Sequence, residues 1–527
     1  MQSWLVSALV ALAIAGRLLF FVYSTWCHAQ KARRLDCKAV PLYPSKDPFG
    51  ISTLLKTREA ARKKRLPALA EERIDSLSSQ LGRYVSTFRM YQAGRENLFT
   101  VDWKNIQAML VTQFNDFGLG DMRHNVAGPV VGHGIFTTDG EDWKHSRSLL
   151  RPQFKRDQMS NLDSEERHVQ NALRAIPILS DGWSSEVDIQ AILFRLTLDS
   201  ATEFLFGKSC DSQIAATQRE AGRAADDTFL YAFDRCMWYL AERLRFERLY
   251  WVIYNLEFKK CIDILHAFVD KYVHSALIQV QQDEEKAKGA EKVPSQYIFL
   301  KALARTTKDP FRLRDESLNV LLAGRDTTAS LLSWTILLLA RHRHVFAKLR
   351  SDILEQFGTY DQPCNLDFES LKSCQYLQHF LNETLRLYPI VPFNRRCATK
   401  DTTLPRGGGI DGTSPIYIRK GHTVMYSTYV LHRRKDIWGK DAEIFNPDRW
   451  ARGNVPLGYI PFNAGRRRCI GQEFALMRSS YVLVRLLQRF DQIEDVHPER
   501  EIRFGVSLTS CPADPVTVRL HPAEATV

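Results

Sequence analysis

The sequence lacks several features that would place it in other classes of protein. It has no internal repeat, which excludes solenoids and propellers, and no CxxC pair among its ten cysteines. Cysteines scattered in this way argue against a disulfide framework and favour reduced thiols in the cytosol. It carries neither a dinucleotide-binding fingerprint nor a flavin module. The net charge of +12 comes from dispersed lysines and arginines, which favours an anionic membrane surface or an acidic partner protein over nucleic acid.

One long apolar run stands at the N-terminus. Residues 3–27 hold a single charge, Arg17, and are long enough to cross a bilayer of about 30 Å. A basic cluster over 31–34 follows the run. Because positive residues remain on the cytosolic side, we expect the N-terminus outside and the bulk of the chain in the cytosol. No basic region precedes the run, so an uncleaved transmembrane anchor over 1–30 is favoured over a cleaved signal peptide.

Helical patterns dominate the rest of the chain. Residues 313–343 are apolar on nearly every face, which predicts a long helix buried through the protein centre. Residues 398–431 contain GGG, Thr-Ser-Pro and then PIYIRKGHTVMYSTYV, whose β-branched and aromatic content is typical of a hairpin. We therefore expect a mainly α fold with a small β component, in one large domain over 51–527 behind a basic and proline-rich hinge over 31–50.

A lone cysteine directly follows three arginines in PFNAGRRRCIG, residues 461–471. Helical spacing resumes just after Cys469, and the amide groups of a helix N-terminus together with guanidinium groups favour a thiolate. A thiolate in a buried loop serves either as a nucleophile or as a metal ligand, and no cysteine-protease signature surrounds this one. The alternative, a buried core cysteine, leaves the three arginines unexplained.

The spacing of this stretch carries a family resemblance. Phe462, Gly465, Arg467, Cys469 and Gly471 fit the pattern FxxGxRxCxG, and here the chain resembles the cytochromes P450. The resemblance implies the cytochrome P450 fold, with a single large haem domain behind the membrane anchor. It also implies that Cys469 is the axial ligand of the haem iron, that Arg467 contacts a haem propionate, and that the glycines let the backbone turn beneath the haem.

Three further positions match the family in its order along the chain. In NETLRLYP, Glu383 and Arg386 stand one helical turn apart, a spacing that permits an ion pair. In FNPDRW, Arg449 matches the third member of the same triad. Taken alone, the pair reads as a surface salt bridge. The resemblance makes the three residues a structural triad that holds the cysteine loop.

The stretch AGRDTT, residues 323–328, interrupts an otherwise apolar helix. An acid beside an alcohol in a buried helix suits proton delivery, and their hydrogen bonds can open a local groove in the helix. The resemblance assigns the catalytic proton relay to Asp326 and Thr327, with Ala323 and Gly324 leaving room for dioxygen beside the haem. A polar patch on a partly exposed helix is the alternative.

Additional candidates for haem binding lie outside the cysteine loop. Trp143 and Arg147 are four residues apart, so they share a helical face and can reach the same carboxylate. The resemblance identifies that carboxylate as a haem propionate. Arg396 is the second propionate candidate, with Arg395 as the alternative.

Three short segments resemble those of the fungal microsomal alkane and fatty-acid hydroxylases. They are AGRDTT with its arginine, GGGIDG and HRRKDIWG. The resemblance implies a monooxygenase that inserts one oxygen atom of O2 into a C–H bond. The leading substrate is a long-chain alkane or fatty acid, attacked at its end. Oxidative tailoring of a fungal terpenoid or polyketide is the alternative. The aromatic stretch 228–251 reads either as an apolar, membrane-facing entrance or as ordinary helix packing.

Two hypotheses of other classes stand beside the monooxygenase. The first is a non-catalytic haem protein that senses a ligand or stores lipid, and the second is a haem-thiolate isomerase or dehydratase that uses no reductase. Neither has a need for the acid–alcohol pair Asp326 and Thr327.

The electrons must come from another protein, because the chain has no flavin module of its own. The resemblance implies NADPH–cytochrome P450 reductase in the same endoplasmic reticulum membrane, with NADPH used indirectly and cytochrome b5 as a second candidate donor. Arg466 and Arg468 are expected to face outward and to contribute to a basic surface for an acidic partner.

Overall fold

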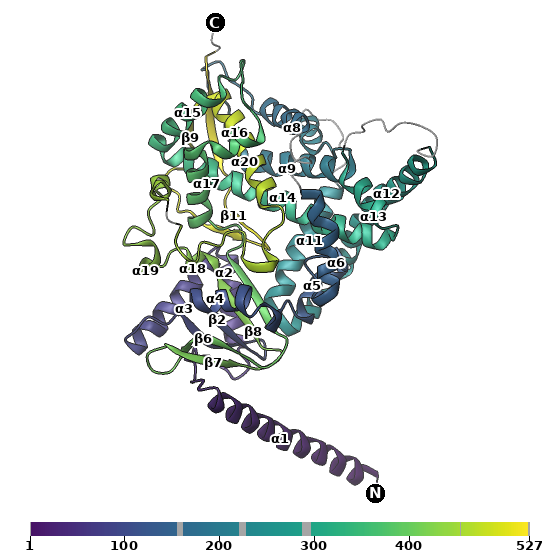
Figure 1. Ribbon diagram of the computed structural model, residues 1–527, viewed down its shortest axis with the longest axis vertical. Helices are drawn as coiled ribbons and strands as arrows, with labels where there is room; N and C mark the ends of the chain where they lie inside the picture. The colour runs from purple at the N-terminus through teal and green to yellow at the C-terminus, as the bar shows by residue number, and fades with distance from the viewer. Residues whose placement is uncertain (1, 155–161, 221–227, 287–296, 454, 525–527) are drawn as a thin grey trace.

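A long helix, α14 (Pro310–Arg341), runs through the centre of the computed structural model, with other helices packed around it (Figure 1). The structure describes residues 2–154, 162–220, 228–286, 297–453 and 455–524. Among these, helices outnumber strands in residues, and the expected mainly α fold with a small β component is confirmed. The N-terminal helix, α1 (Gln2–Arg34), projects from the body beside strands β6 and β7 (Figure 1).

The remaining α-helices follow in chain order. They are α2 (Ile51–Arg62), α3 (Leu66–Leu81), α4 (Trp103–Gln107), α5 (Asp121–Val131), α6 (Gly140–Leu150), α8 (Asp163–Arg174), α9 (Ile189–Phe206), α10 (Ser212–Glu220), α11 (Thr228–Arg245), α12 (Leu256–Lys286), α13 (Phe299–Thr306), α15 (Arg343–Phe357), α16 (Phe368–Ser373), α17 (Gln375–Leu387), α18 (Thr428–Leu431), α19 (Lys435–Trp438) and α20 (Gln472–Arg489).

The strands form small sheets. They are β1 (Thr87–Gln92), β2 (Arg95–Thr100), β3 (Phe117–Gly118), β4 (Val187–Asp188), β5 (Phe393–Ala398), β6 (Thr402–Gly408), β7 (Ser414–Ile418), β8 (Thr423–Ser427), β9 (Phe490–Asp495), β10 (Phe504–Val506), β11 (Ser510–Pro512) and β12 (Thr517–Pro522). The largest sheet has the order β1-β2-β8-β5-β3. All its pairs are antiparallel except β2 with β8, which are parallel.

The central helix begins earlier and ends earlier than its apolar pattern predicts. The side chain of Asp309 caps the helix by accepting a hydrogen bond of 3.0 Å from the backbone N–H of Phe311. Pro310 occupies the first turn, where a missing N–H costs nothing. At the other end His342 leaves the helical conformation, and α15 starts in a new direction. The helix therefore spans 310–341 instead of 313–343.

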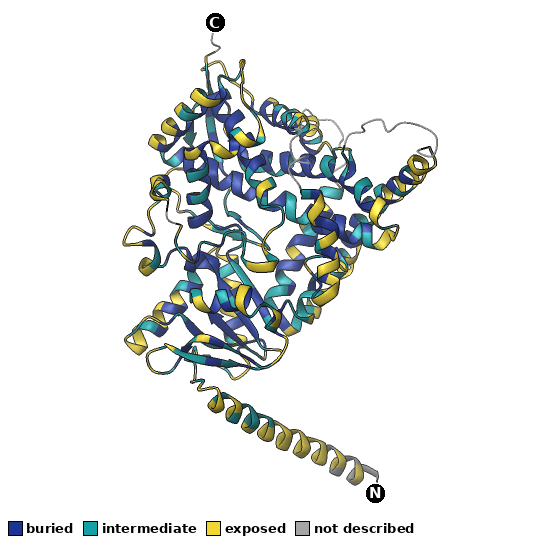
Figure 2. Ribbon diagram, in the orientation of Figure 1, coloured by how far each residue is buried: buried dark blue, intermediate teal, exposed yellow. Residues whose placement is uncertain are grey.

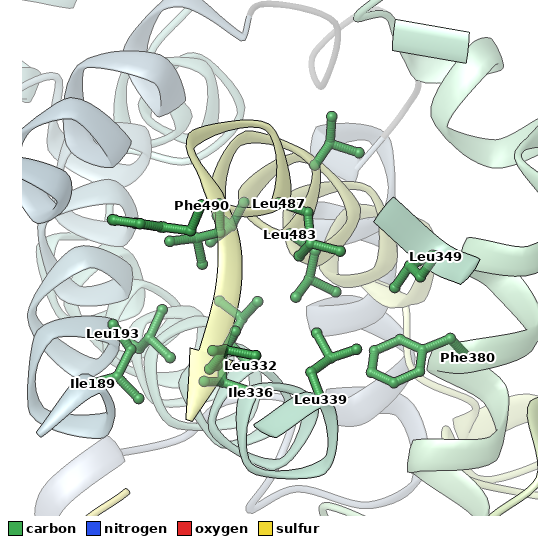
Figure 3. Packing of buried hydrophobic residues seen from close by; sticks show 14 of the residues in the cluster. Ile189, Leu193, Leu332, Ile336, Leu339, Leu349, Phe380, Leu483, Leu487 and Phe490 are labelled. Carbon is green, nitrogen blue, oxygen red and sulfur yellow. The ribbon is translucent and has the colours of Figure 1, made fainter. Parts of the chain in front are cut away.

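The core joins the central helix to α20, which follows the cysteine loop. Figure 3 shows side chains from five helices and one strand meeting in this cluster: Leu332, Ile336 and Leu339 of α14, Leu483 and Leu487 of α20, Ile189 and Leu193 of α9, Leu349 of α15, Phe380 of α17 and Phe490 of β9. Burying one such side chain fully contributes about 1.5–3 kcal/mol. This packing fixes the positions of α14 and α20 relative to each other.

The N-terminal helix is exposed along most of its length (Figure 2). Ala11–Arg34 is long and apolar enough to cross a membrane, judged by length and composition, and none of it is buried inside the body. One apolar helix compatible with a membrane anchor is therefore present. It extends to Arg34, four residues past the expected end of the anchor at 30, because nothing in 31–34 breaks a helix.

Two expectations about local structure are corrected. The first is the hinge over 31–50, which starts as helix and then pairs with the body. The N–H of Tyr43 donates to the carbonyl of Arg89, and the N–H of Arg89 donates to the carbonyl of Pro41, each at 2.8 Å. This extended segment satisfies its backbone against the open edge of strand β1, so part of the expected stiff hinge is attached to the body.

The second correction concerns 398–431. The two strands of PIYIRKGHTVMYSTYV, β7 and β8, do not form the expected hairpin in the described residues: β7 pairs antiparallel with β6. Strand β8 pairs with β2 and β5 in the largest sheet. Its residues, TVMYS, have the same β-branched and aromatic character as those of β7, so composition does not reveal which partner each strand takes.

Candidate functional site

A cavity of about 300 Å³ lies between the cysteine loop and the central helix. Its walls contain ten of the residues singled out from the sequence, from α6, α14, β5, the cysteine loop and the start of α20. They are Trp143, Arg147, Ala323, Gly324, Thr327, Arg396, Phe462, Arg467, Cys469 and Gly471. Segments more than 300 residues apart in the chain thus meet around one space.

The cysteine loop is a tight turn built on one glycine. Gly465 has a φ of +67°, a conformation that side chains disfavour. A Cβ placed there would stand 1.7 Å from the carbonyl oxygen of Leu110, so no other residue fits. The loop then closes when the N–H of Cys469 donates to the carbonyl of Phe462 at 3.0 Å. Gly465 does not itself line the cavity; it shapes the loop that does.

Cys469 is exposed at the cavity, while the surrounding protein removes its thiol from bulk water. Burial raises the pKa of this thiol, while the N–H of Gly471 and the charges of Arg147 and Arg468 lower it. In the protein alone burial outweighs the other effects, so the expectation that helix and arginines by themselves favour the thiolate is corrected. A metal cation at the sulfur reverses that balance, because a coordinating thiol is deprotonated outright.

The carboxylate of Glu383 is the centre of a buried polar network beneath the loop. Both its oxygens accept hydrogen bonds from Arg386, at 2.8 and 2.9 Å, and neither side chain is exposed. Arg449 approaches one oxygen at 3.4 Å. Trp450 Nε1 and the backbone N–H of Asn446 donate at 3.0 and 2.9 Å. The residue spacing seen in the sequence therefore produces a buried ion pair, not a surface salt bridge.

His432 connects this network to the cysteine loop. Its Nδ1 lies 3.1 Å from the carbonyl oxygen of Arg386, and its Nε2 accepts from the N–H of Ile460 at 3.0 Å. Burial lowers the pKa of His432 to about 3. The ring is therefore neutral, with the proton on Nδ1, and it donates to α17 while it holds the start of the loop. The sequence contained HRRKDIWG but gave no sign of this contact.

A cluster of arginines borders the cavity with little negative charge to balance it. Arg123 of α5, Arg396 of β5 and Arg467 of the loop all line the space. Among the described residues, Arg467 pairs with Asp139 at 2.5 Å, whereas Arg123 reaches only the neutral Oδ1 of Asn394, at 3.5 Å. The Nε atoms of Arg123 and Arg467 are buried and have no hydrogen-bond partner in the part of the chain that the structure describes.

The electrostatics of the cluster indicate an anionic ligand. Burial and the neighbouring charges of Arg395 and Arg396 lower the pKa of Arg123 to about 9. Burial also lowers the pKa of Arg467 to about 10, although Asp139 opposes the change. Buried cations that lack counter-charges are costly, and the two propionates of a haem would supply them. The residues present thus fit a haem whose carboxylates point toward this cluster.

The structure distinguishes between the two candidate arginines of β5. Arg396 lines the cavity, whereas Arg395 points to Glu247 and pairs with it at 3.1 Å. Trp143 and Arg147 both border the cavity, as their shared helical face predicts, and Arg467 stacks on the Trp143 ring at 4.4 Å. Arg123 was missed, because DMRHN in α5 contains no motif and only the fold brings it to the cavity.

The wall opposite Cys469 is formed by α14. Ala323, Gly324 and Thr327 line the cavity, and the Thr327 hydroxyl donates to the Ala323 carbonyl at 2.5 Å. The helix is continuous through this point, so no open groove interrupts it. Asp326 is buried but does not line the cavity; it accepts a hydrogen bond of 3.0 Å from the neighbouring Arg325.

The aromatic stretch 228–251 does not border the cavity in the described part of the chain. Phe233 and Tyr239 are buried in a hydrophobic cluster with α12, whereas Trp238 and Trp251 are exposed. Most of this segment therefore packs as an ordinary helix pair, and its exposed rings lie on the surface.

Three features define a haem-thiolate enzyme: a cysteine loop at a cavity, arginines that border the cavity with few counter-charges, and a central helix that lines it with Ala323, Gly324 and Thr327. Comparison with known proteins agrees. Residues 68–514 match the cytochrome P450 family. The chain is 44% identical over 524 residues to cytochrome P450 monooxygenase g430 of a Fusarium species, covering 98% of this chain and 89% of that protein.

Other relatives are similar over nearly their whole length. Cytochrome P450 monooxygenase alt2 of Alternaria solani is 41% identical, with 92% of this chain and 91% of that protein covered. Cytochrome P450 52A13 of Debaryomyces hansenii is 43% identical, with 92% of each chain covered. The chain belongs to the cytochrome P450 family. It is a monooxygenase that uses a haem with a cysteine thiolate ligand and receives electrons from NADPH through a redox partner.

Proposed function

We propose that this monooxygenase hydroxylates the terminal carbon of long-chain alkanes or fatty acids. The observation that carries the proposal is the apolar part of the cavity wall. It is formed by Leu119, Ile135, Phe136, Val320, Leu331, Ile390 and Val391. Such a wall offers contacts to a hydrocarbon and none of the polar groups that a hydroxylated substrate needs. The likeness of AGRDTT and HRRKDIWG to the fungal alkane and fatty-acid hydroxylases supports it.

The residues of the site have separate roles in this reaction. When bound, the haem supplies the redox chemistry that places one oxygen atom of O2 in a C–H bond and reduces the other to water. Cys469 would hold the iron, and Arg123, Arg396 and Arg467 would bind the propionates. Ala323 and Gly324 leave space beside the central helix. Thr327, with its hydroxyl at the cavity, and Asp326 behind it move protons to the reacting oxygen.

Oxidative tailoring of a terpenoid or polyketide is the second candidate. Sequence identity does not decide between the two substrate classes. Cytochrome P450 52A13 and cytochrome P450 monooxygenase g430 are about equally similar to this chain, at 43% and 44%. The same cysteine loop and central helix serve either substrate, because the side chains that select the substrate lie on other walls of the cavity.

A binding screen followed by product analysis tests the substrate. Purified enzyme is titrated with alkanes and fatty acids of C12 to C18 and with polycyclic terpenoids, and the shift of the Soret band is recorded. We expect the linear chains to shift the band and to yield ω-hydroxylated products with a reductase and NADPH. A shift with polycyclic compounds alone would rule out the linear substrates and favour the second candidate.

We also propose that the enzyme is a single-pass protein of the endoplasmic reticulum membrane with its catalytic domain in the cytosol, and that NADPH–cytochrome P450 reductase or cytochrome b5 is the partner. The basic residues that end α1 support this orientation. Arg466 and Arg468 are exposed beside Cys469 and suit an acidic partner. Charge reversal at Arg466 should raise the KM for the reductase and weaken its dependence on salt; an unchanged KM would remove this arginine from the interface.

A further inference from the structure

The buried arginine of AGRDTT has two carboxylate partners, a feature that the proposed reaction does not explain. Nη1 of Arg325 lies 2.5 Å from Oδ1 of Asp234 on α11 and 3.0 Å from Oδ1 of Asp326 on its own helix. The Arg325 and Asp326 side chains are 5% and 7% exposed, whereas that of Asp234 is 53% exposed. A buried cation thus bridges an interior carboxylate and one at the surface.

Other contacts hold Arg325 in place. Its guanidinium stacks on Phe194 of α9 and Phe233 of α11, at 5.2 and 5.0 Å from the ring centres. Its Nε has no hydrogen-bond partner in the described part of the chain. Burial opposes the charged form of Arg325, and the two carboxylates restore it, so the pKa of Arg325 lies above its ordinary value. Arg325 therefore stays charged and needs at least one carboxylate at all times.

Asp326 has to move if it is to deliver protons. It does not line the cavity, while the next residue, Thr327, does. Burial raises the pKa of the Asp326 carboxyl, although Arg325 counteracts part of the effect, so the group is able to hold a proton. If Arg325 had only this carboxylate, turning Asp326 toward the cavity would leave a buried, unpaired cation at a cost of about 3–5 kcal/mol.

We propose that Asp234 is a positioning residue that keeps Arg325 neutralised while the Asp326 side chain turns toward Thr327. The inference rests on the proposed role of Asp326 in proton delivery. In each cycle Asp326 accepts one proton from water on the α11 side, where Asp234 meets solvent, and releases it at the Thr327 side. Arg325 keeps its proton throughout, and every group ends with the charge it had at the start.

A double-mutant cycle on thermal unfolding tests the shared neutralisation without any turnover. The full-length, haem-loaded protein is compared with Asp234→Asn, Asp326→Asn and the double variant. Each single variant leaves Arg325 one carboxylate, so its Tm should fall only slightly. The double variant leaves Arg325 without either carboxylate. Its Tm should therefore fall by about 3–4 °C more than the sum of the two decreases seen in the single variants. Additive losses would overturn the proposal.

Steady-state kinetics test whether the Asp326 side chain turns toward Thr327. Dodecanoic acid is the substrate and a reductase is the electron donor. In Asp234→Asn, Asp326 is the remaining partner of Arg325 and should be held there. We expect kcat to fall about tenfold with KM unchanged, the solvent deuterium isotope effect on kcat to rise, and Asp234→Glu to restore both. Asp263→Asn, an exposed carboxylate on α12, is the matched control and should behave as wild type.

The two arms separate the failure of this inference from that of the proposed function. If the wild type does not oxidise dodecanoic acid, the proposed substrate is wrong, and the unfolding cycle still decides whether Asp234 and Asp326 share Arg325. If Asp234→Asn retains the wild-type kcat and isotope effect, Asp234 does not position Asp326.

Discussion

The two walls of the cavity are built in opposite ways. On the cysteine side, the carboxylate of Glu383 accepts hydrogen bonds from several donors at once, and His432 ties α17 to the loop through both ring nitrogens. On the central helix, the polar side chains can exchange one hydrogen-bond partner for another. The Thr327 hydroxyl donates to its own helix, and the Arg325 guanidinium is shared by two carboxylates.

The contrast follows from what each wall does. An axial ligand works only when the sulfur stays in one position, so a rigid and fully satisfied network suits it. A proton relay has to change partners during the reaction, so its groups need second partners of similar energy. Substitutions on the cysteine side should therefore reduce folding and haem retention, whereas those on the α14 side should alter turnover and leave the protein folded.

Removal of Arg386 should have the largest effect. Arg386→Ala leaves Glu383 as a buried carboxylate without its main partner, which costs about 3–5 kcal/mol. We expect little haem-loaded protein and a marked fall in Tm, measured by haem content and calorimetry. The exposed pair Arg343 and Glu494 serves as control, because Arg343→Ala should cost no more than about 1 kcal/mol. Similar losses for both variants would contradict the scaffold role.

Arg123→Leu should have opposite effects on the two forms of the protein. In the haem-free form it removes a half-buried cation that has no carboxylate partner among the described residues, so the apoprotein should become more stable. In the haem-bound form it removes a charge-assisted hydrogen bond worth about 1.5–3 kcal/mol, so haem should dissociate faster. Calorimetry of both forms and haem transfer to apomyoglobin measure the effects. A variant that stabilises or destabilises both forms equally would remove Arg123 from the propionate site.

Thr327→Ala should leave folding and haem binding intact and change the yield of the reaction. Without the hydroxyl, proton delivery slows, and we expect the fraction of electrons that reach product to fall about tenfold while peroxide rises. Thr335 is a matched control, because its hydroxyl makes the same kind of bond, to Leu332, away from the cavity. Unchanged coupling in Thr327→Ala would exclude Thr327 from the relay.

The smallest effect is expected where α1 meets the body. Lys31 Nζ lies 2.7 Å from Asp401, and His28 Nδ1 lies 3.1 Å from the hydroxyl of Tyr417. Burial alone would raise the pKa of the Asp401 carboxyl, but the hydrogen bonds from Lys31 and from the N–H of Lys420 outweigh it and lower that pKa.

The stability that this contact adds is therefore fully present above the ordinary pKa of an aspartate, about 4, and is lost as the pH falls further, through the lowered pKa of Asp401. Asp401→Asn should increase the motion of α1 relative to the body at pH 7, as distances between spin labels report, and change the Tm by less than about 1 °C. An unchanged distance distribution would show that Asp401 does not hold the anchor.

The sequence was informative where a local pattern had one structural solution. The spacing around Cys469 and the apolar length of the central helix led to the correct loop and helix, and most of the chosen residues of both, though not Gly465 or Asp326, border one cavity. The sequence was uninformative where the result depends on which segments meet. Nothing near Arg123 indicated that α5 carries it to Arg396, and β8 looks like a hairpin strand until its pairing with β2 is known.

The protonation state of the Cys469 thiol is a further property that the sequence alone could not predict. Neighbouring arginines predicted a thiolate from sequence, but the degree of burial, which decides the balance at Cys469, exists only in the folded chain. For the same reason the second carboxylate partner of Arg325 could not be read from AGRDTT, since Asp234 comes from a helix some ninety residues away.

The reduced, carbon-monoxide-treated absorption spectrum tests the central claim most directly. The wild-type protein should show the red-shifted Soret band of a thiolate-ligated haem. Cys469→Ala should lose that band, while Cys511→Ala, which removes a half-buried thiol outside the cavity lining, should keep it. A folded wild type without the band, or a Cys469→Ala variant that retains it, would contradict the assignment of Cys469 as the iron ligand.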